Sequence, residues 1–179
     1  ENKQFTGVLK TDNDLIISCT DIHAGIEIDN YFNKFNEDVL RSRFNQYLDK
    51  LFEVQIRHGS ENAYVILSEL VSGIIHNELR IENNQNLIEQ FLSVTNYISQ
   101  FLAELSYHFN TINVYVFPGN HSRVMARKEE SLKGENIDHL AIPFLQAKLQ
   151  NFKNINFNTN DIEESIAMFN VRNNVVMSS

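Results

Sequence analysis

Three short apolar runs alternate with two long stretches of helical periodicity, and this alternation limits the possible folds more than any other feature of the sequence. The apolar runs cover residues 14–20, 63–67 and 111–117, and each has the length of a buried strand. Between them, apolar residues recur every three or four positions over 37–58 and 84–109, which predicts two amphipathic helices. Strands joined by helical crossovers pair in parallel through right-handed connections. The order therefore predicts an α/β fold built on a parallel sheet.

The segment after the third run is predicted to add one helix and three short strands. The helix covers residues 137–150 and is broken or kinked at Pro143, which cannot donate a backbone hydrogen bond. The strands cover residues 154–157, 165–171 and 174–178, with a tight connection between the last two. No repeat or domain linker interrupts the chain, so residues 1–179 are expected to form a single domain.

Composition and charge narrow the classes of function. Hydrophobic residues make up 42% of the chain and charged residues 21%, which is typical of a globular domain. The net charge of -8 argues against a broad basic face, so a nucleic-acid substrate would need local cationic side chains or bound cations. The single cysteine, Cys19, excludes an internal disulfide and favours a reducing compartment such as the cytoplasm. No run is long enough to span a membrane, and no membrane partner is expected.

Residues of the metal-ligand type follow the first two apolar runs. Asp21 and His23 are separated by one residue, and residues i and i+2 of an extended chain point the same way, so both are expected to converge on one ion. The alternative is that Asp21 caps a turn and His23 lies on the surface. Glu69 follows the second run in the same manner, and His76 lies further along, where it can equally open a turn.

The third run ends at Pro118 and Gly119, two strong chain-breakers in a row. Asn120, His121 and Arg123 follow at once, and all three can hold a metal or a phosphate. The alternative is an ordinary strand-to-helix turn with polar residues in solvent. In an open parallel sheet, ligands bind beyond the carboxyl ends of the strands. Because three successive strand ends carry such residues, we expect one site at this edge of the sheet.

Residues 26–36 are predicted to form a loop rich in asparagine and aromatic residues. Tyr31, Phe32 and Phe35 could flank a substrate there, but packing is their expected role. A role for this loop in substrate binding is therefore the alternative to packing.

The side chains at the strand ends suit a divalent metal centre. Asp, His, Glu and Asn form a mixed oxygen and nitrogen ligand set, which favours manganese, iron, zinc or magnesium over a thiolate-bound metal. Two ions held about 3.5–4 Å apart can clamp a phosphoryl group and share a hydroxide for in-line attack. Glu69 would bridge the ions, and His121 would stabilise the phosphorane or protonate the leaving oxygen. The sequence contains no Gly-x-Ser-x-Gly elbow, no Gly-x-x-x-x-Gly-Lys loop and no dinucleotide glycine fingerprint.

Residues 21–23, Asp-Ile-His, resemble the first motif of the calcineurin-like metallophosphoesterases, and residues 119–121, Gly-Asn-His, resemble the third. Residues 67–69, Leu-Ser-Glu, fall where that family carries its Gly-Asp motif. The sequence around these motifs is similar to that of phage and prophage members of the family, which are described as relatives of double-strand-break repair nucleases. The resemblance implies an αββα sandwich with a dinuclear site, manganese as the expected metal, and the cytoplasm of a bacterial host cell. It also implies Asp21 and His23 on one ion and Asn120 on the other, with His121 as the catalytic histidine.

Two departures from the family pattern stand out. Glu69 replaces the bridging aspartate and Ser68 replaces its glycine. The additional methylene extends the side chain by about 1.5 Å, and a misplacement of about 1 Å can cost on the order of a hundredfold in rate. Family members also carry histidine ligands in later Gly-His or His-Gly motifs, whereas no histidine follows His139. The natural chain is therefore expected to continue past Ser179, or this version has lost that half of the site.

These features support two functions of different class. The first is a metal-dependent phosphodiesterase or nuclease-like hydrolase, with Arg123 and His76 as substrate contacts. The second is a non-catalytic binding or assembly protein of the same fold with a degraded metal site. The substrate remains open among DNA, RNA, cyclic nucleotides and phosphoproteins, and so does the oligomeric state.

Overall fold

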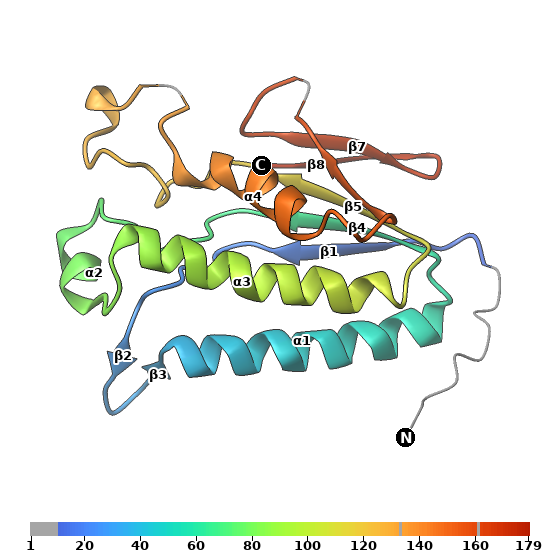
Figure 1. The fold of residues 1–179 in the computed structure, drawn as a ribbon, viewed down its shortest axis with the longest axis horizontal. Coiled ribbons are helices and arrows are strands. Elements are labelled where there is room, and N and C mark those ends of the chain that lie inside the picture. Colours follow the sequence, from blue (N-terminus) through green and yellow to red (C-terminus); the bar gives the residue numbers. More distant parts are fainter. Residues whose placement is uncertain (1–10, 133, 161) are drawn as a thin grey trace.

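A parallel four-stranded sheet forms the centre of the molecule, in the order β1-β4-β5-β6 (Figure 1). The computed structural model describes residues 11–132, 134–160 and 162–179. The four strands are β1 (Leu15–Cys19), β4 (Asn62–Leu67), β5 (Thr111–Val116) and β6 (Ile155–Asn158). Each pairs in parallel with its neighbour, so all four carboxyl ends lie at one edge of the sheet. The predicted α/β class and parallel sheet are confirmed.

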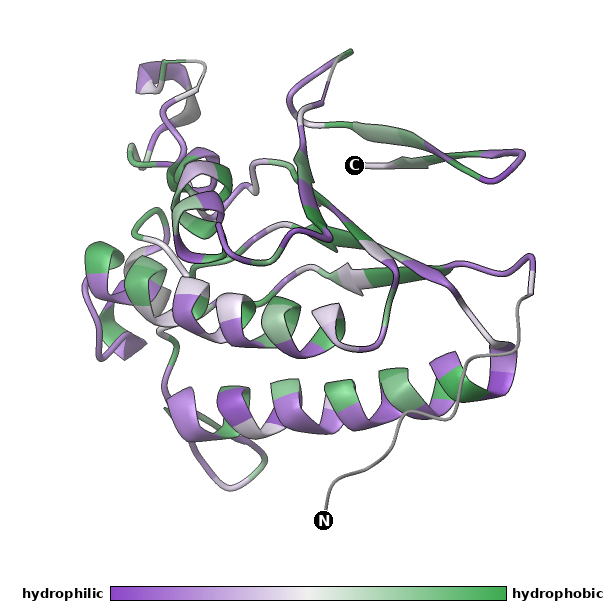
Figure 2. Ribbon diagram, turned by 45° about the vertical axis from the view of Figure 1, so that its right-hand side comes forward, coloured by the Kyte–Doolittle hydropathy of each residue, from purple (hydrophilic) through white to green (hydrophobic). Residues whose placement is uncertain are grey.

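Three helices cover one face of this sheet: α1 (Glu37–His58), α3 (Leu87–Ser106) and α4 (Ala141–Lys148). Their apolar sides bury Leu51, Phe101 and Leu145 in one cluster with Val65 and Val114 of the central strands. α1 shows polar and apolar residues in alternation along its turns, as an amphipathic helix does (Figure 2). This cluster is the main hydrophobic core.

Capping explains where the two long helices begin. The Asn36 side chain accepts a hydrogen bond from the Val39 N–H, so α1 begins at the predicted residue. Asn86 and Glu89 form a reciprocal capping box, so α3 begins at Leu87, three residues after the predicted start at residue 84. Pro143 lies in the first turn of α4, where a missing N–H costs little, and a 3₁₀ turn (Ile137–Leu140) precedes it.

A two-stranded hairpin packs on the opposite face of the sheet. It consists of β7 (Ala167–Val171) and β8 (Asn174–Ser178), which pair antiparallel. Phe169 stacks on Tyr64 of β4 and Tyr115 of β5, with ring centroids 5.4 and 4.3 Å away. In the turn, Arg172 pairs with Asp14 at 2.7 Å and with Glu61 at 3.2 Å, which ties the hairpin to the amino ends of β1 and β4. The described layers are thus helices, parallel sheet and hairpin.

A small hairpin and a short helix lie beyond the carboxyl edge of the sheet (Figure 1). The hairpin is β2 (Ile28–Asp29) with β3 (Lys34–Phe35), and the helix is α2 (Asn77–Glu82). The Glu27 N–H donates to the Glu82 carbonyl at 3.1 Å, so the two elements support each other. A further 3₁₀ turn, Lys128–Glu130, lies on the long loop after β5.

This hairpin corrects the expectation that residues 26–36 pack as a loop. Phe35 does pack against the main core. Tyr31 and Phe32 do not, because they form the tip of the hairpin and are 95% and 92% exposed. The packing prediction is therefore right for one ring and wrong for two.

Candidate metal centre

Side chains from three strand ends meet at the carboxyl edge of the sheet. His23 follows β1, Glu69 follows β4 and His121 follows β5. One ring nitrogen of each histidine and one carboxylate oxygen of Glu69 lie within 4.8 Å of one another. These three groups could hold a metal ion together.

The backbone that aims these groups is left-handed. Asp21, His23 and Glu69 have φ angles of 55°, 48° and 50°, which costs a non-glycine residue about 1–3 kcal/mol. The N–H groups of Ile22 and His23 both donate to the Glu69 carbonyl, at 3.0 and 3.1 Å, and so lock the ends of β1 and β4 together. The chain is thus not extended at Asp21 and His23, and the i, i+2 argument for their convergence is wrong. They approach through a strained turn instead.

The Glu69 carboxylate lies on the backbone of the turn after β5. One oxygen accepts a hydrogen bond from the Asn120 N–H, and the other accepts from the His121 N–H at 2.9 Å. Gly119 permits this approach, because a Cβ at that position would lie 2.5 Å from the Glu69 carboxyl carbon. Glu69 therefore joins the second strand end to the third.

Asp21 and Asn120 lie at the same edge but outside the tight cluster. The Asp21 side chain is 75% exposed, and its carboxylate is 3.7 Å from His23 Nε2. Asn120 is exposed and reaches the cluster through its backbone N–H. Its carbonyl accepts a hydrogen bond from Arg123 Nε at 3.1 Å. The Asp21 carboxylate is therefore outside the group of ligand atoms that lie within 4.8 Å of one another, and Asn120 contacts that group through its backbone.

His121 is held from several directions. Its Nδ1 lies 3.3 Å from the Ser72 carbonyl, and its ring centroid is 4.5 Å from that of His23 and 4.9 Å from that of His76. Gly73 packs against the same backbone, because a Cβ there would lie 1.9 Å from the His121 carbonyl oxygen. The loop after β4 thus fixes the position of His121, and His76 lies beside it.

The electrostatic state of His23 fits metal binding. Burial lowers the pKa of His23, and His121 lowers it further, while Glu69 and Asp21 act in the opposite direction. Neutral imidazole is the form that ligates metals. His23 Nδ1 is buried and has no hydrogen-bond partner among the described residues. The two histidines and the carboxylate, with one nitrogen unpartnered, therefore suit a divalent ion.

Two residues that the sequence did not single out clamp the turn that carries Asn120. Asp138 is fully buried and accepts a hydrogen bond from the Gly119 N–H at 3.0 Å. Asn136 donates from its side chain to the Gly119 carbonyl at 2.7 Å. Burial raises the pKa of Asp138 from 3.8 to about 6. The only sequence signal was Asn136 as a helix cap, and nothing local marked Asp138.

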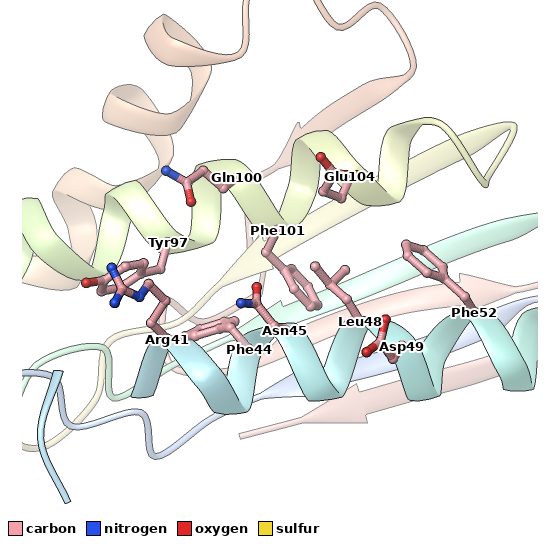
Figure 3. Close-up of a pocket in the computed structure, with 10 residues that line it drawn as sticks. All are labelled: Arg41, Phe44, Asn45, Leu48, Asp49, Phe52, Tyr97, Gln100, Phe101 and Glu104. Carbon is pink, nitrogen blue, oxygen red and sulfur yellow. The ribbon is translucent and has the colours of Figure 1, made fainter. Parts of the chain in front are cut away.

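A hollow of about 480 Å³ adjoins the cluster, and Asn120, Arg123, Asn136 and His139 are among the residues that line it. Arg123 Nη1 is buried and, in the part of the chain that the structure describes, meets no hydrogen-bond acceptor. A separate hollow of about 470 Å³ lies between α1 and α3, with Phe44 and Phe101 among its lining residues (Figure 3). No predicted site residue lines this second hollow. Of these two hollows, the one beside Asn120 is therefore the one that predicted site residues line.

Comparisons of the chain with models of protein families, with curated proteins and with solved structures find no match. The resemblance to the metallophosphoesterases therefore rests on the sequence motifs alone and stays a prediction. Within residues 11–132, 134–160 and 162–179, no helix combines the length and the apolar character needed to cross a membrane.

Proposed function

We propose that this chain is a metal-dependent phosphoester hydrolase of the phosphodiesterase or nuclease type. The observation that carries the proposal is the approach of His23, Glu69 and His121 to within 4.8 Å at the carboxyl edge of a parallel sheet. That edge is where open α/β sheets bind their ligands. Strained, non-glycine backbone at Asp21, His23 and Glu69 also fits a functional site, where such strain clusters.

The metal ligands in this proposal are Asp21, His23, Glu69 and Asn120. A bound divalent pair, manganese being the expected metal, would supply a hydroxide nucleophile at neutral pH and neutralise phosphoryl charge. The chain itself keeps His23 neutral through burial and keeps Glu69 in place through two backbone N–H groups. Asp21 remains solvent-exposed, on the side from which a substrate can approach.

His121 is assigned to proton transfer rather than to metal binding, although one of its ring nitrogens lies within 4.8 Å of the ligand atoms of His23 and Glu69. A backbone carbonyl can only accept, so the 3.3 Å approach of Nδ1 to the Ser72 carbonyl favours a proton on Nδ1. Nε2 is then the atom that accepts a proton in the free site and donates one to a leaving oxygen. A fixed tautomer of this kind is what general acid–base catalysis by histidine requires.

Arg123 and His76 are assigned to substrate binding. Arg123 lines the hollow beside Asn120 and has one unpartnered nitrogen, which can donate to a phosphate oxygen. His76 is exposed, and its ring lies 4.9 Å from that of His121. Arg123 is thus placed beside Asn120, and His76 beside His121.

The αββα sandwich belongs to the same proposal. The helices, the parallel sheet and the β7–β8 hairpin provide three layers in the order that such a sandwich requires. Met168, Val175 and Met177 remain 45%, 69% and 70% exposed on the hairpin. An apolar outer surface of this kind is what a further helical layer would cover.

One observation favours the second function, a binding protein with a degraded site. Both oxygens of Glu69 already accept backbone hydrogen bonds, so the carboxylate is committed to the turn. A carboxylate offers about four lone-pair positions, however, and two hydrogen bonds leave about two of them for metal. We therefore rank hydrolysis first.

Hydrolysis of bis-p-nitrophenyl phosphate with and without manganese separates the two functions. The hydrolase proposal expects manganese-dependent turnover and bound metal by elemental analysis. Absence of both in the folded protein would support the binding protein and remove the hydrolase.

A further inference from the structure

The tip of the β2–β3 hairpin presents two aromatic rings to solvent. Tyr31 and Phe32 are 95% and 92% exposed, which is unusual for two large adjacent apolar side chains. Their rings meet edge to face, with centroids 5.1 Å apart and planes at 88°. Each ring therefore offers an open face in a different direction.

The tip is held in one conformation by its own turn. The Asn30 side chain accepts hydrogen bonds from the Phe32 and Asn33 N–H groups, each at 3.0 Å. The Asn30 N–H donates to the Asn33 carbonyl at 2.9 Å. At the base, Phe35 packs into the core and Arg43 lies 5.0 Å above its ring. The backbone that carries the two exposed rings is thus pre-positioned, which lowers the entropic cost of binding.

The tip lies on the same side of the molecule as the candidate metal centre. The hairpin and α2 both extend beyond the carboxyl ends of the strands (Figure 1). Tyr31 is eight positions after His23, so the chain between them spans at most about 26–29 Å. A ligand of several nucleotides can therefore touch the tip and the centre together.

The surroundings of the two rings favour a nucleobase over a protein surface. Their neighbours Asp29, Asn30, Asn33 and Lys34 are polar, so the apolar patch is far smaller than a stable protein interface of about 800 Å² per partner. Base stacking needs only an accessible ring face. Lys34 and Asp29 form a solvent-exposed pair at 3.0 Å, which a phosphate can replace because exposed pairs contribute little.

We propose that Tyr31 and Phe32 form a stacking platform for the bases of a single-stranded polynucleotide. This inference rests on the proposed function. The polynucleotide bound at the tip would be the substrate, and one of its phosphodiester groups would reach the metal centre. The net charge of -8 leaves stacking rather than phosphate attraction as the main source of affinity. Binding should then depend only weakly on salt between about 50 and 200 mM.

The first test uses tryptophan as a reporter, because the chain has none. Phe32→Trp places one indole at the tip, and Tyr107→Trp places one at the far end of α3, where Tyr107 is 67% exposed. Oligothymidine and oligouridine are titrated in chelator, so that no hydrolysis occurs. We expect quenching at position 32 and none at position 107, with the two probes distinguishing DNA from RNA. Binding without quenching at position 32, or no binding of either probe, overturns the proposal.

The second test compares two double variants of the tip by fluorescence anisotropy in chelator. Tyr31→Ala with Phe32→Ala should weaken binding of the single strand at least about fivefold for each ring removed. Tyr31→Leu with Phe32→Leu keeps apolar area but removes the aromatic faces, and should weaken binding similarly. Unchanged affinity in the alanine variant, or full affinity in the leucine variant, contradicts base stacking. Self-association that the alanine variant abolishes would show that the tip contacts a second copy instead.

The tests separate this inference from the function on which it rests. Binding is measured without metal, so a chain that hydrolyses no phosphodiester can still show the platform. Hydrolysis of bis-p-nitrophenyl phosphate without quenching at position 32 would support the proposed function and overturn the stacking platform.

Discussion

The Glu69 side chain lies directly against the backbone of Gly119, so closely that a Cβ at position 119 would be 2.5 Å from the Glu69 carboxyl carbon. This contact connects the second strand end to the third. The carboxylate then reaches the Asn120 and His121 N–H groups. Glycine is thus required at position 119, where a Cβ would also lie 2.7 Å from the Glu69 Cα.

Gly119→Ala should therefore displace the Glu69 carboxylate. Overpacking of this kind costs about 1–3 kcal/mol of folding free energy, and manganese affinity should fall because a ligand has moved. Urea unfolding and isothermal titration with manganese measure the two effects. Adding Glu69→Asp to Gly119→Ala shortens the side chain and should recover part of the stability; an additive loss in the double variant would argue against the contact.

Glu69→Asp alone introduces the residue type that the metallophosphoesterases carry in the motif that residues 67–69 resemble. Since a misplacement of about 1 Å can cost on the order of a hundredfold, turnover of bis-p-nitrophenyl phosphate should rise, by up to about that factor. Glu69→Gln is the matched control, because it keeps the size and removes the charge, and it should lose metal. A lower rate for the aspartate variant than for the natural glutamate would show that this site is built around the longer side chain.

Alanine substitutions of His23, Asp21 and His121 should differ in their effects on manganese affinity and on the rate of hydrolysis. His23→Ala should lose manganese affinity, because it removes a half-buried proposed ligand whose pKa is lowered. His121→Ala should retain most affinity and lose about 10²–10⁴ in kcat, which is the range for a general acid or base. Asp21→Ala should abolish activity. Titration calorimetry measures the manganese affinity of each variant, and steady-state kinetics measures its kcat. Full activity in the Asp21 or His121 variant would remove that residue from the mechanism.

Asp138 should make stability depend on pH. Its folded pKa of about 6 lies above its ordinary value of 3.8, so the folded state binds its proton more tightly than the unfolded state does. The stabilising contribution is complete below about pH 4 and is lost as the pH rises through 6. A shift of this size corresponds to about 2–3 kcal/mol. Asp138→Asn should therefore gain stability relative to the natural protein between pH 4 and 7 in urea unfolding; parallel pH curves would contradict this.

The fold was largely predictable because its signals are local. Apolar runs of strand length mark β1, β4 and β5, and three- and four-residue periodicity marks α1 and α3. The start of α3 was predicted three residues too early, because the prediction did not use the capping box that Asn86 and Glu89 form. The αββα architecture came only from resemblance and stays a proposal.

The approach of His23, Glu69 and His121 at one edge of the sheet was predictable, whereas the backbone geometry that produces it was not. Ligand-type side chains at successive strand ends indicated the edge of the sheet. The left-handed backbone at Asp21 and His23 could not be predicted, because it depends on the Glu69 carbonyl of a distant strand end. Asp138 was missed for the same reason, since its partner is 19 residues away. Local patterns also cannot tell whether Tyr31 and Phe32 face the core or the solvent.

The most direct test of the central claim is anomalous diffraction from crystals of the protein grown with manganese. The account predicts an anomalous peak at the carboxyl edge of the sheet, in contact with His23 and Glu69. Full manganese occupancy elsewhere, with no peak between these two side chains, would contradict it.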